Sequence, residues 1–187
     1  MTRIVLPGEP LVDGPTLLRP WRDSDAAALT AACQDPDVVR WTRVPANYTE
    51  ADARAFLLYR HDAVLAGVDA PFAVVSADDR VLGSVALMAI EWADLRAEVG
   101  YWLAREARGH GHATRAVRLI SEWGFGVLGL ERIELRAATD NQASQRVAER
   151  SGFTREALLR AYFRGKQGQE DMFAFGLLAG EPGPTLG

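Results

Sequence analysis

One stretch of the sequence has the residue types and spacing of an anion site. The turn Arg108-Gly109-His110-Gly111-His112-Ala113 stands between an apolar run that ends at Leu103 and a helical pattern that begins at Gly111. The start of a helix leaves backbone N–H groups without internal partners and carries the positive end of the helix dipole. The two glycines let the backbone approach a ligand closely, and Thr114 adds a hydroxyl donor. The turn therefore predicts a phosphate or pyrophosphate site.

Glycine spacing alone is a weak signal, and three other kinds of site are disfavoured. Thr114 stands where a dinucleotide-binding fingerprint has its third glycine, and no Gly-Lys-Ser/Thr follows, as a P-loop requires. His110 and His112 are two residues apart on a turn, so we expect them to diverge, and no third ligand has suitable spacing for a metal. We therefore expect no metal, and we expect the two histidines to flank the phosphates.

A second candidate for chemistry is Glu98, an acid within the apolar run 97–103. A carboxylate that is partly shielded there would have a raised pKa, closer to that of a useful general base. The alternative is a structural charge, either at a sheet edge or paired with an arginine such as Arg96 or Arg136. The sequence leaves both interpretations open.

Asn141 and Ser144 are three residues apart at the start of a predicted helix, so they share one face. Their amide and hydroxyl groups could both contact a ligand there. For Asn141, a helix cap after Asp140 is an equally good explanation. Among the aromatic residues, Trp41 and Trp102 are candidates for the wall of an acceptor pocket, because aromatic side chains commonly line such pockets.

The elements that must position these residues follow from hydrophobic periodicity and turn signals. We expect strands at 16–20, 71–76, 81–88, 97–103, 133–137, 153–159 and 172–178, and helices from about 23 to 32, from about 49, at 111–125 and at 143–150. The strands 71–76 and 81–88 should pair as a hairpin around Asp78-Asp79. A strand–helix–strand–helix unit among antiparallel hairpins predicts a mixed α/β sheet with helices on both faces.

The order of four motifs carries a family resemblance. They are Glu98-Val99-Gly100-Tyr101-Trp102-Leu103, Arg108-x-x-Gly111-x-Ala113, Asn141-x-x-Ser144 and Ser151-Gly152-Phe153. Together they resemble the GNAT superfamily of N-acetyltransferases, in particular the branch that acetylates the N-terminal amines of ribosomal proteins. The resemblance implies a GNAT fold, with a twisted, mostly antiparallel mixed sheet of six to seven strands flanked by about four helices. We expect one domain over residues 1–180 and a flexible tail over 181–187.

The resemblance also implies roles for individual residues. Two central parallel strands of this fold splay apart, so Val99, Gly100, Tyr101 and Trp102 would line the cofactor acetyl-CoA in the gap. Asn141 would bond the pantetheine arm, and Ser144 would lie near the sulfur, where its hydroxyl could protonate or hydrogen-bond the departing thiolate. Tyr162 is the alternative acid, because other branches use a tyrosine late in the chain. Arg115 stands where the branch usually has Glu, and we expect it to face solvent or a phosphate.

The expected function is transfer of an acetyl group from acetyl-CoA to a primary amine, by direct attack in a ternary complex. A protein N-terminus and a small-molecule amine both remain open as acceptors, and the alternative is a non-catalytic acyl-CoA-binding or sensing module. A net charge of −4 does not favour nucleic acid, and no apolar run is long enough to span a membrane. The single cysteine, Cys33, suits buried packing in a cytoplasmic protein. The branch often pairs, so a homodimer is also among the expectations.

Overall fold

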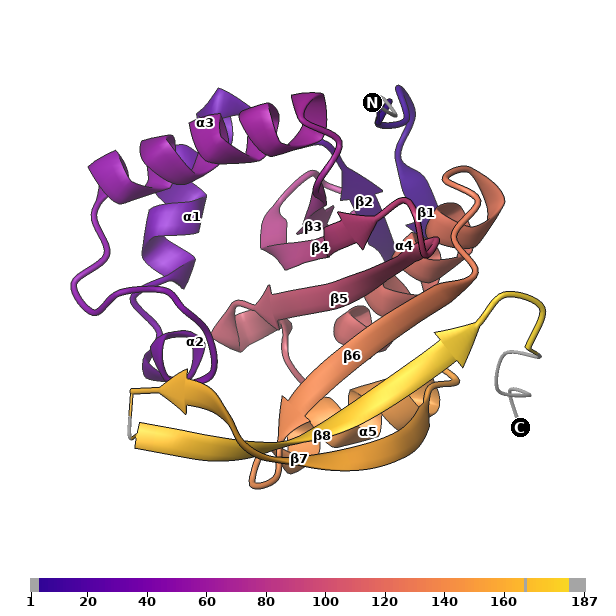
Figure 1. Cartoon of the computed structure of the whole chain (residues 1–187). Helices are drawn as coiled ribbons and strands as arrows, with labels where there is room; N and C mark the ends of the chain where they lie inside the picture. Colours follow the sequence, from indigo (N-terminus) through magenta and orange to yellow (C-terminus); the bar gives the residue numbers. More distant parts are fainter. Residues whose placement is uncertain (1–3, 167, 182–187) are drawn as a thin grey trace.

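Two short strands, three helices and a run of three strands precede an alternating segment in the computed structural model, which describes residues 4–166 and 168–181 (Figure 1). The strands are β1 (Leu11–Asp13), β2 (Thr16–Arg19), β3 (Ala70–Val75), β4 (Val81–Glu91), β5 (Arg96–Leu103), β6 (Arg132–Ala138), β7 (Thr154–Gly165) and β8 (Gly168–Leu178). The helices are α1 (Ala26–Ala32), α2 (Pro36–Trp41), α3 (Glu50–Leu65), α4 (His112–Gly126) and α5 (Gln142–Arg150). Apart from Glu181, the predicted tail lies outside the described residues.

Within the described residues the strands form one eight-stranded sheet in the order β1-β2-β3-β4-β5-β6-β8-β7. Only the β5–β6 pair is parallel, and the other neighbours are antiparallel. The mixed α/β class is therefore confirmed. The expected strand number was slightly too low, because the three-residue strand β1 has too few residues to show a period. The short helix α2 was missed as well.

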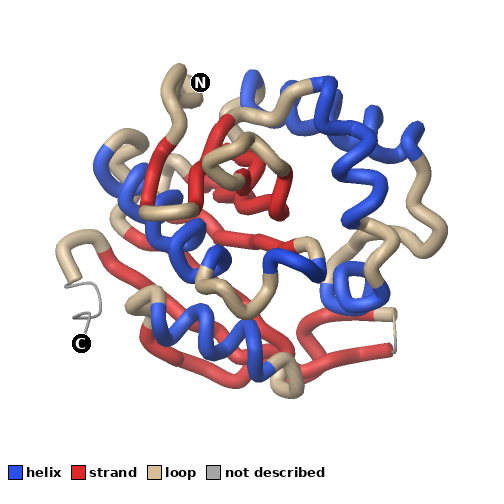
Figure 2. The backbone as a smooth tube through the Cα atoms, turned by 180° about the vertical axis from the view of Figure 1, so that it is seen from behind, coloured by secondary structure: helices blue, strands red, loops and turns tan. Residues whose placement is uncertain are grey.

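Helices cover both faces of the sheet, as Figures 1 and 2 show from opposite sides. The strand alternation explains this, because successive side chains of β5 point to opposite faces. Val99 and Leu103 join the main apolar cluster with buried residues of α4 such as Ile120. Trp102 packs instead against a second, smaller cluster built from α1, α2 and α3. The sheet therefore separates two apolar clusters.

The central strands part after a short parallel segment. β5 pairs with β6 only from Arg96↔Arg132 to Glu98↔Glu134, and beyond that point β6 continues its pairing with β8. The remaining part of β5, from Val99 to Leu103, thus diverges from β6. This divergence leaves a gap, called the wedge below, in which β5 and β6 form no backbone hydrogen bonds with each other.

Candidate active site

A cleft of about 1230 Å³ passes through the wedge and joins the two sides of the sheet. Segments distant in sequence line it, from α1–α3 through β4, β5 and β6 to α4, α5 and the β7–β8 hairpin. The predicted site residues that line it are Trp41, Glu98, Val99, Gly100, Tyr101, Trp102, Arg108, Gly109, Gly111, His112, Ala113, Thr114, Asn141, Ser144 and Tyr162. His110 is exposed and does not line the cleft. One cavity thus brings together nearly all the residues singled out from the sequence.

The predicted anion turn has the backbone that it requires. Gly109 and Gly111 have φ angles of 82° and 79°, in the left-handed region where glycine is favoured. Gly111 is the N-cap of α4, and because it has no side chain it cannot satisfy the first N–H groups of the helix. These groups are therefore available to an anion. The Arg115 guanidinium lies across the turn and donates to the His110 carbonyl over 2.8 Å.

His112 is held in place by β2, a strand that packs against α4. Its Nδ1 shares a hydrogen bond of 2.8 Å with the hydroxyl of Thr16, which is fully buried on β2. Burial lowers the pKa of His112, and the charges of Arg115 and His110 lower it further. The His110 and His112 ring centroids are 6.3 Å apart. No cluster of three potential metal ligands occurs among residues 4–166 and 168–181.

Arg108 ties the anion turn to helix α2. Its Nη1 donates to Asp37 over 2.9 Å, and its Nη2 donates to Asp35 and to the Leu103 carbonyl, each over 3.0 Å. Asp35 is the N-cap of α2, and its carboxylate also accepts from Arg105 over 3.0 Å. Burial opposes ionisation of Asp35, but its bonds to Arg108, the Asp37 N–H and Arg105 outweigh it, so the net pKa is lowered. A phosphate contact by Arg108 remains a prediction.

The wedge itself is bridged by two side chains. The Tyr101 hydroxyl donates to Ser144 Oγ over 3.0 Å, from β5 to the first turn of α5. Asn141 caps that helix, because its Oδ1 accepts from the Ser144 N–H over 3.1 Å. The capping explanation for Asn141 is thus confirmed. Burial raises the pKa of Tyr101 to about 12.

Glu98 is half-buried and ion-paired. Its Oε2 accepts from Arg136, whose Nη2 also donates to Glu134 over 2.9 Å. Burial raises the pKa of Glu98, the Arg136 charge counteracts this, and the Glu134 charge adds to it. The pKa of Glu98 is raised overall, as a general base would need. Glu98 also pairs with Arg136, as the alternative of a structural charge predicts. Both features therefore coexist at one carboxylate.

Comparison with known proteins decides the family. The family model of the acetyltransferase (GNAT) domain matches residues 16–154. The chain belongs to the GNAT acetyltransferase family. It is 31% identical over 165 residues to the uncharacterised N-acetyltransferase p20 of Bacillus licheniformis, an alignment that covers 88% of this chain and 93% of that protein. The resemblance stated from the four motifs is therefore confirmed, and with it the N-acetyltransferase class.

Two further relatives bind or modify named acceptors. The ribosomal-protein-serine acetyltransferase of Escherichia coli is 30% identical over 83 residues, which is 44% of this chain and 46% of that protein. The crystal structure of spermidine N-acetyltransferase from Vibrio cholerae, in complex with CoA and spermine, has a TM-score of 0.78. It is 20% identical and covers 89% of this chain and 96% of that chain, so the likeness shows the fold.

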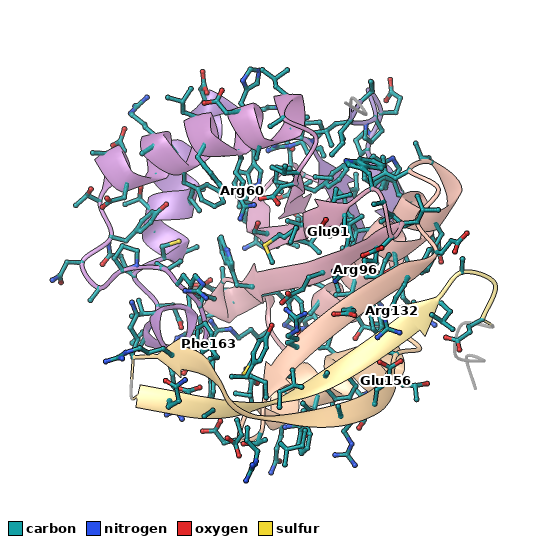
Figure 3. The ribbon with its side chains drawn as sticks, viewed as in Figure 1. Arg60, Glu91, Arg96, Arg132, Glu156 and Phe163 are labelled. Atoms are coloured by element: carbon teal, nitrogen blue, oxygen red, sulfur yellow. The ribbon has the colours of Figure 1, made fainter. Side chains whose placement is uncertain are left out.

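The side of the cleft formed by α1–α3 and the β7–β8 hairpin contains residues that the sequence did not point to. Arg43 stacks over Phe163 at 5.0 Å, and Arg60 donates to Asp69 over 3.0 Å. Figure 3 shows Arg60 between α3 and the sheet, and Phe163 beside α2. These pairs join segments far apart in sequence, so no local pattern reveals them. The missed helix α2 did have a local signal in the sequence, because Asp35 before Pro36 is a helix cap followed by a first-turn proline.

Tyr162 reaches the cleft through an irregularity of β7. The pairing of β7 with β8 shifts between Leu159 and Phe163. Ala161 in this bulge has a φ of 49°, and its N–H donates to Asp171 Oδ1 over 2.7 Å. The following Tyr162 ring lies against the Arg136 guanidinium, with 5.0 Å from Cζ to the ring centroid. Tyr162 therefore touches the arginine that pairs with Glu98.

Proposed function

We propose that this GNAT acetyltransferase transfers the acetyl group of acetyl-CoA to a primary amine by direct attack in a ternary complex. One observation carries the proposal: the start of α4, the wedge and Glu98 line a single cleft. Because residues from both faces of the sheet line the cleft, we infer that donor and acceptor approach one point from opposite directions. Holding two reactants in this way supplies a large part of the rate enhancement, roughly 7–11 kcal/mol in ideal cases.

Direct attack is favoured over a covalent acetyl-enzyme by the state of the only cysteine. Cys33 is buried, with 1% of its surface exposed, and burial raises the pKa of its thiol to about 12. The thiolate is the nucleophilic form of cysteine, so a thiol with this pKa is unreactive at neutral pH. An acceptor amine that attacks the thioester itself needs no such intermediate.

The donor half of the cleft suits the parts of acetyl-CoA. The unpaired N–H groups at the start of α4 would bind its pyrophosphate, between Gly109 and Thr114. The free backbone groups of Val99 to Trp102 would line the pantetheine arm in the wedge. The Ser144 hydroxyl would donate a hydrogen bond to the sulfur as it departs.

Glu98 is the proposed acceptor-side group. Its Oε2 accepts from Arg136, and within residues 4–166 and 168–181 no protein hydrogen bond to its Oε1 competes with an incoming amine. With a raised pKa, the carboxylate can accept the proton that the amine loses on attack, directly or through a water. Relatives of this chain are named as a ribosomal-protein-serine acetyltransferase and a spermidine N(1)-acetyltransferase. A primary amine is the group that these acceptors share.

A thiol-release assay with acetyl-CoA over a panel of amines tests the proposal. The panel contains spermidine, simple alkylamines and peptides with free N-termini, and calorimetry measures acetyl-CoA binding in parallel. We expect saturable binding together with CoA release for at least one amine. Tight binding without release for every amine would instead identify a non-catalytic acyl-CoA-binding or sensing module.

The role of Glu98 is tested separately with Glu98→Gln. The amide keeps the size of the side chain and removes its basicity. We expect kcat to fall by about 100-fold or more, as general-base catalysis contributes roughly 10²–10⁴-fold. Unaltered activity across the pH range would remove Glu98 as the base.

A further inference from the structure

Tyr101 and Ser144 form a contact that no motif predicts. Tyr101 lies on β5 three residues beyond Glu98, where the parallel pairing with β6 ends. Ser144 lies on α5, the helix that follows β6. Their hydrogen bond of 3.0 Å joins β5 to α5 at the place where β5 and β6 no longer join each other. Both side chains line the cleft, so the contact faces the space assigned to the donor.

The direction of this bond constrains the serine. The two oxygens are 3.0 Å apart, and the phenol is more acidic than an aliphatic hydroxyl, so Tyr101 is the favoured donor and Ser144 Oγ acts as the acceptor. The hydroxyl hydrogen of Ser144 must then point away from Tyr101, since the two hydrogens cannot share one line. In a free helix, a serine hydroxyl would also turn back to a carbonyl of its own helix, as Ser121 does toward Val117 over 2.7 Å. The contact with Tyr101 opposes that rotation.

We propose that Tyr101 is a positioning residue that directs the Ser144 hydroxyl hydrogen into the wedge, at the sulfur of the leaving group. The proposal rests on the role of Ser144 in the proposed function. It assigns Tyr101 no contact with the reacting atoms. It gives the tyrosine of the Glu98–Leu103 strand a purpose other than packing.

The Tyr101 hydroxyl stays protonated at the pH values that matter for the reaction. Tyr101 packs against the main apolar cluster, and burial raises the pKa of Tyr101 to about 12. The phenol therefore remains a protonated donor throughout the pH range in which amines are acylated. The orientation of Ser144 does not depend on pH.

The chemical step balances without a proton from serine. The amine nitrogen forms its bond to the acetyl carbon, the carbon–sulfur bond breaks, and the electron pair of that bond goes to sulfur. The amine proton passes to Glu98 or to water. A thiol has a pKa of about 8.5, far below that of a serine hydroxyl, so sulfur can leave as the thiolate. Ser144 contributes a hydrogen bond to this developing charge, and its own proton stays on oxygen.

The first test compares Tyr101→Phe, Ser144→Ala and the double variant. Deleting one donor to a developing anion costs roughly 100-fold or more in kcat, and losing only its orientation should cost about tenfold. We expect Tyr101→Phe to lower kcat by about tenfold with the Kd of acetyl-CoA unchanged, and to have little further effect in the Ser144→Ala background. Tyr59→Phe is the matched control, because Tyr59 is 59% exposed and does not line the cleft.

A second test needs no turnover. The thiolate absorbance of CoA bound to the protein reports the pKa of its thiol. An oriented hydroxyl stabilises the thiolate, so that pKa should be higher on Tyr101→Phe and on Ser144→Ala than on the wild type. Ser144→Thr retains a hydroxyl that Tyr101 can reach, so it should behave as the wild type.

The outcomes separate this inference from the proposed function. If Ser144→Ala loses kcat and Tyr101→Phe does not, the positioning role of Tyr101 is wrong and the role of Ser144 stands. Fully additive losses in the double variant would also overturn the inference, because Tyr101 would then act independently of Ser144. If Ser144→Ala is fully active, the role of Ser144 at the sulfur and the positioning role of Tyr101 are both wrong. If Tyr101→Phe does not fold, Tyr101→Leu, which also lacks the hydroxyl and keeps an apolar side chain, takes its place in both tests.

Discussion

The two halves of the cleft are built in different ways. The proposed donor half consists of two consecutive strand-to-helix units, β5–α4 and β6–α5, and offers mainly backbone groups. The proposed acceptor half consists of side chains from α1–α3, β4 and the β7–β8 hairpin, which meet only in the folded chain. A backbone site depends on glycines and short spacings, so it can be read from a sequence. A side-chain site depends on contacts between distant segments.

The two halves also differ in whether their polar groups already have partners within the protein. The start of α4 presents N–H groups that no side chain of its cap satisfies. On the acceptor side, Arg136 pairs with Glu98 and Glu134, and Arg60 pairs with Asp69. The donor half is therefore prepared for an anion, whereas most acceptor-side charges already have partners within the protein.

The largest expected effect on acetyl-CoA binding comes from Gly111→Val, in the donor half. A β-branched residue at a φ of 79° is strained by about 1–3 kcal/mol, and its Cβ would lie 2.9 Å from Arg115 Nη1. Relief of that strain would rotate the first N–H groups of α4. We expect the Kd of acetyl-CoA to rise by about 10- to 100-fold, measured by calorimetry.

Gly126→Val is the control for that substitution. Gly126 ends the same helix, its φ is not positive, and an added Cβ meets nothing within 4 Å. The control should bind acetyl-CoA as the wild type does. An unchanged Kd for Gly111→Val would remove the helix start as the pyrophosphate site.

The acceptor half is tested with Trp41→Ala. Trp41 lines the cleft, and the Arg40 guanidinium lies 4.3 Å from its ring centroid. Loss of an aromatic wall of this kind costs about 1–2 kcal/mol, which is roughly 5- to 30-fold. We expect the KM for the amine to rise by that factor while the Kd of acetyl-CoA stays constant. A rise in the Kd of acetyl-CoA instead would show that α2 contributes to acetyl-CoA binding as well as to amine binding.

Much of the proposed donor half could be placed from the sequence. The helix start after Gly111 and the Asn141–Ser144 pair follow from local periodicity, glycine and capping chemistry, whereas the splayed strands were implied only by the family resemblance. The acceptor half was predicted as Trp41, Trp102 and Glu98, with Tyr162 as an alternative acid. Its missing parts, such as the Arg43–Phe163 stacking and the β7 bulge at Ala161, depend on contacts across more than a hundred residues or on extra residues in one strand of a ladder.

The two halves meet at Asp35, which caps α2 and pairs with Arg105 and Arg108. Asp35→Ala removes the cap and both ion pairs, and should lower the free energy of unfolding by about 1–2 kcal/mol. Asp35→Asn keeps a good cap and removes only the charge, so denaturant unfolding should show a smaller loss. Both variants should raise the KM for the amine more than the Kd of acetyl-CoA, because α2 carries Trp41. Equal losses of stability would mean that the ion pairs contribute more than the cap.

The smallest effect is a shift in pH dependence from Arg136→Gln. The rate should increase with pH as Glu98 ionises, because the carboxylate is the proposed base. The Arg136 charge lowers the pKa of Glu98 against the effect of burial, so its removal raises that pKa further. The acidic limb of kcat against pH should therefore move to higher pH. Arg132→Gln is the control, because Arg132 lies on the same strand and bonds Glu134 and Glu156 but not Glu98 (Figure 3). If the limb moves by the same amount in a Glu98→Gln background, another group controls it, and the acceptor half has a base that remains to be located.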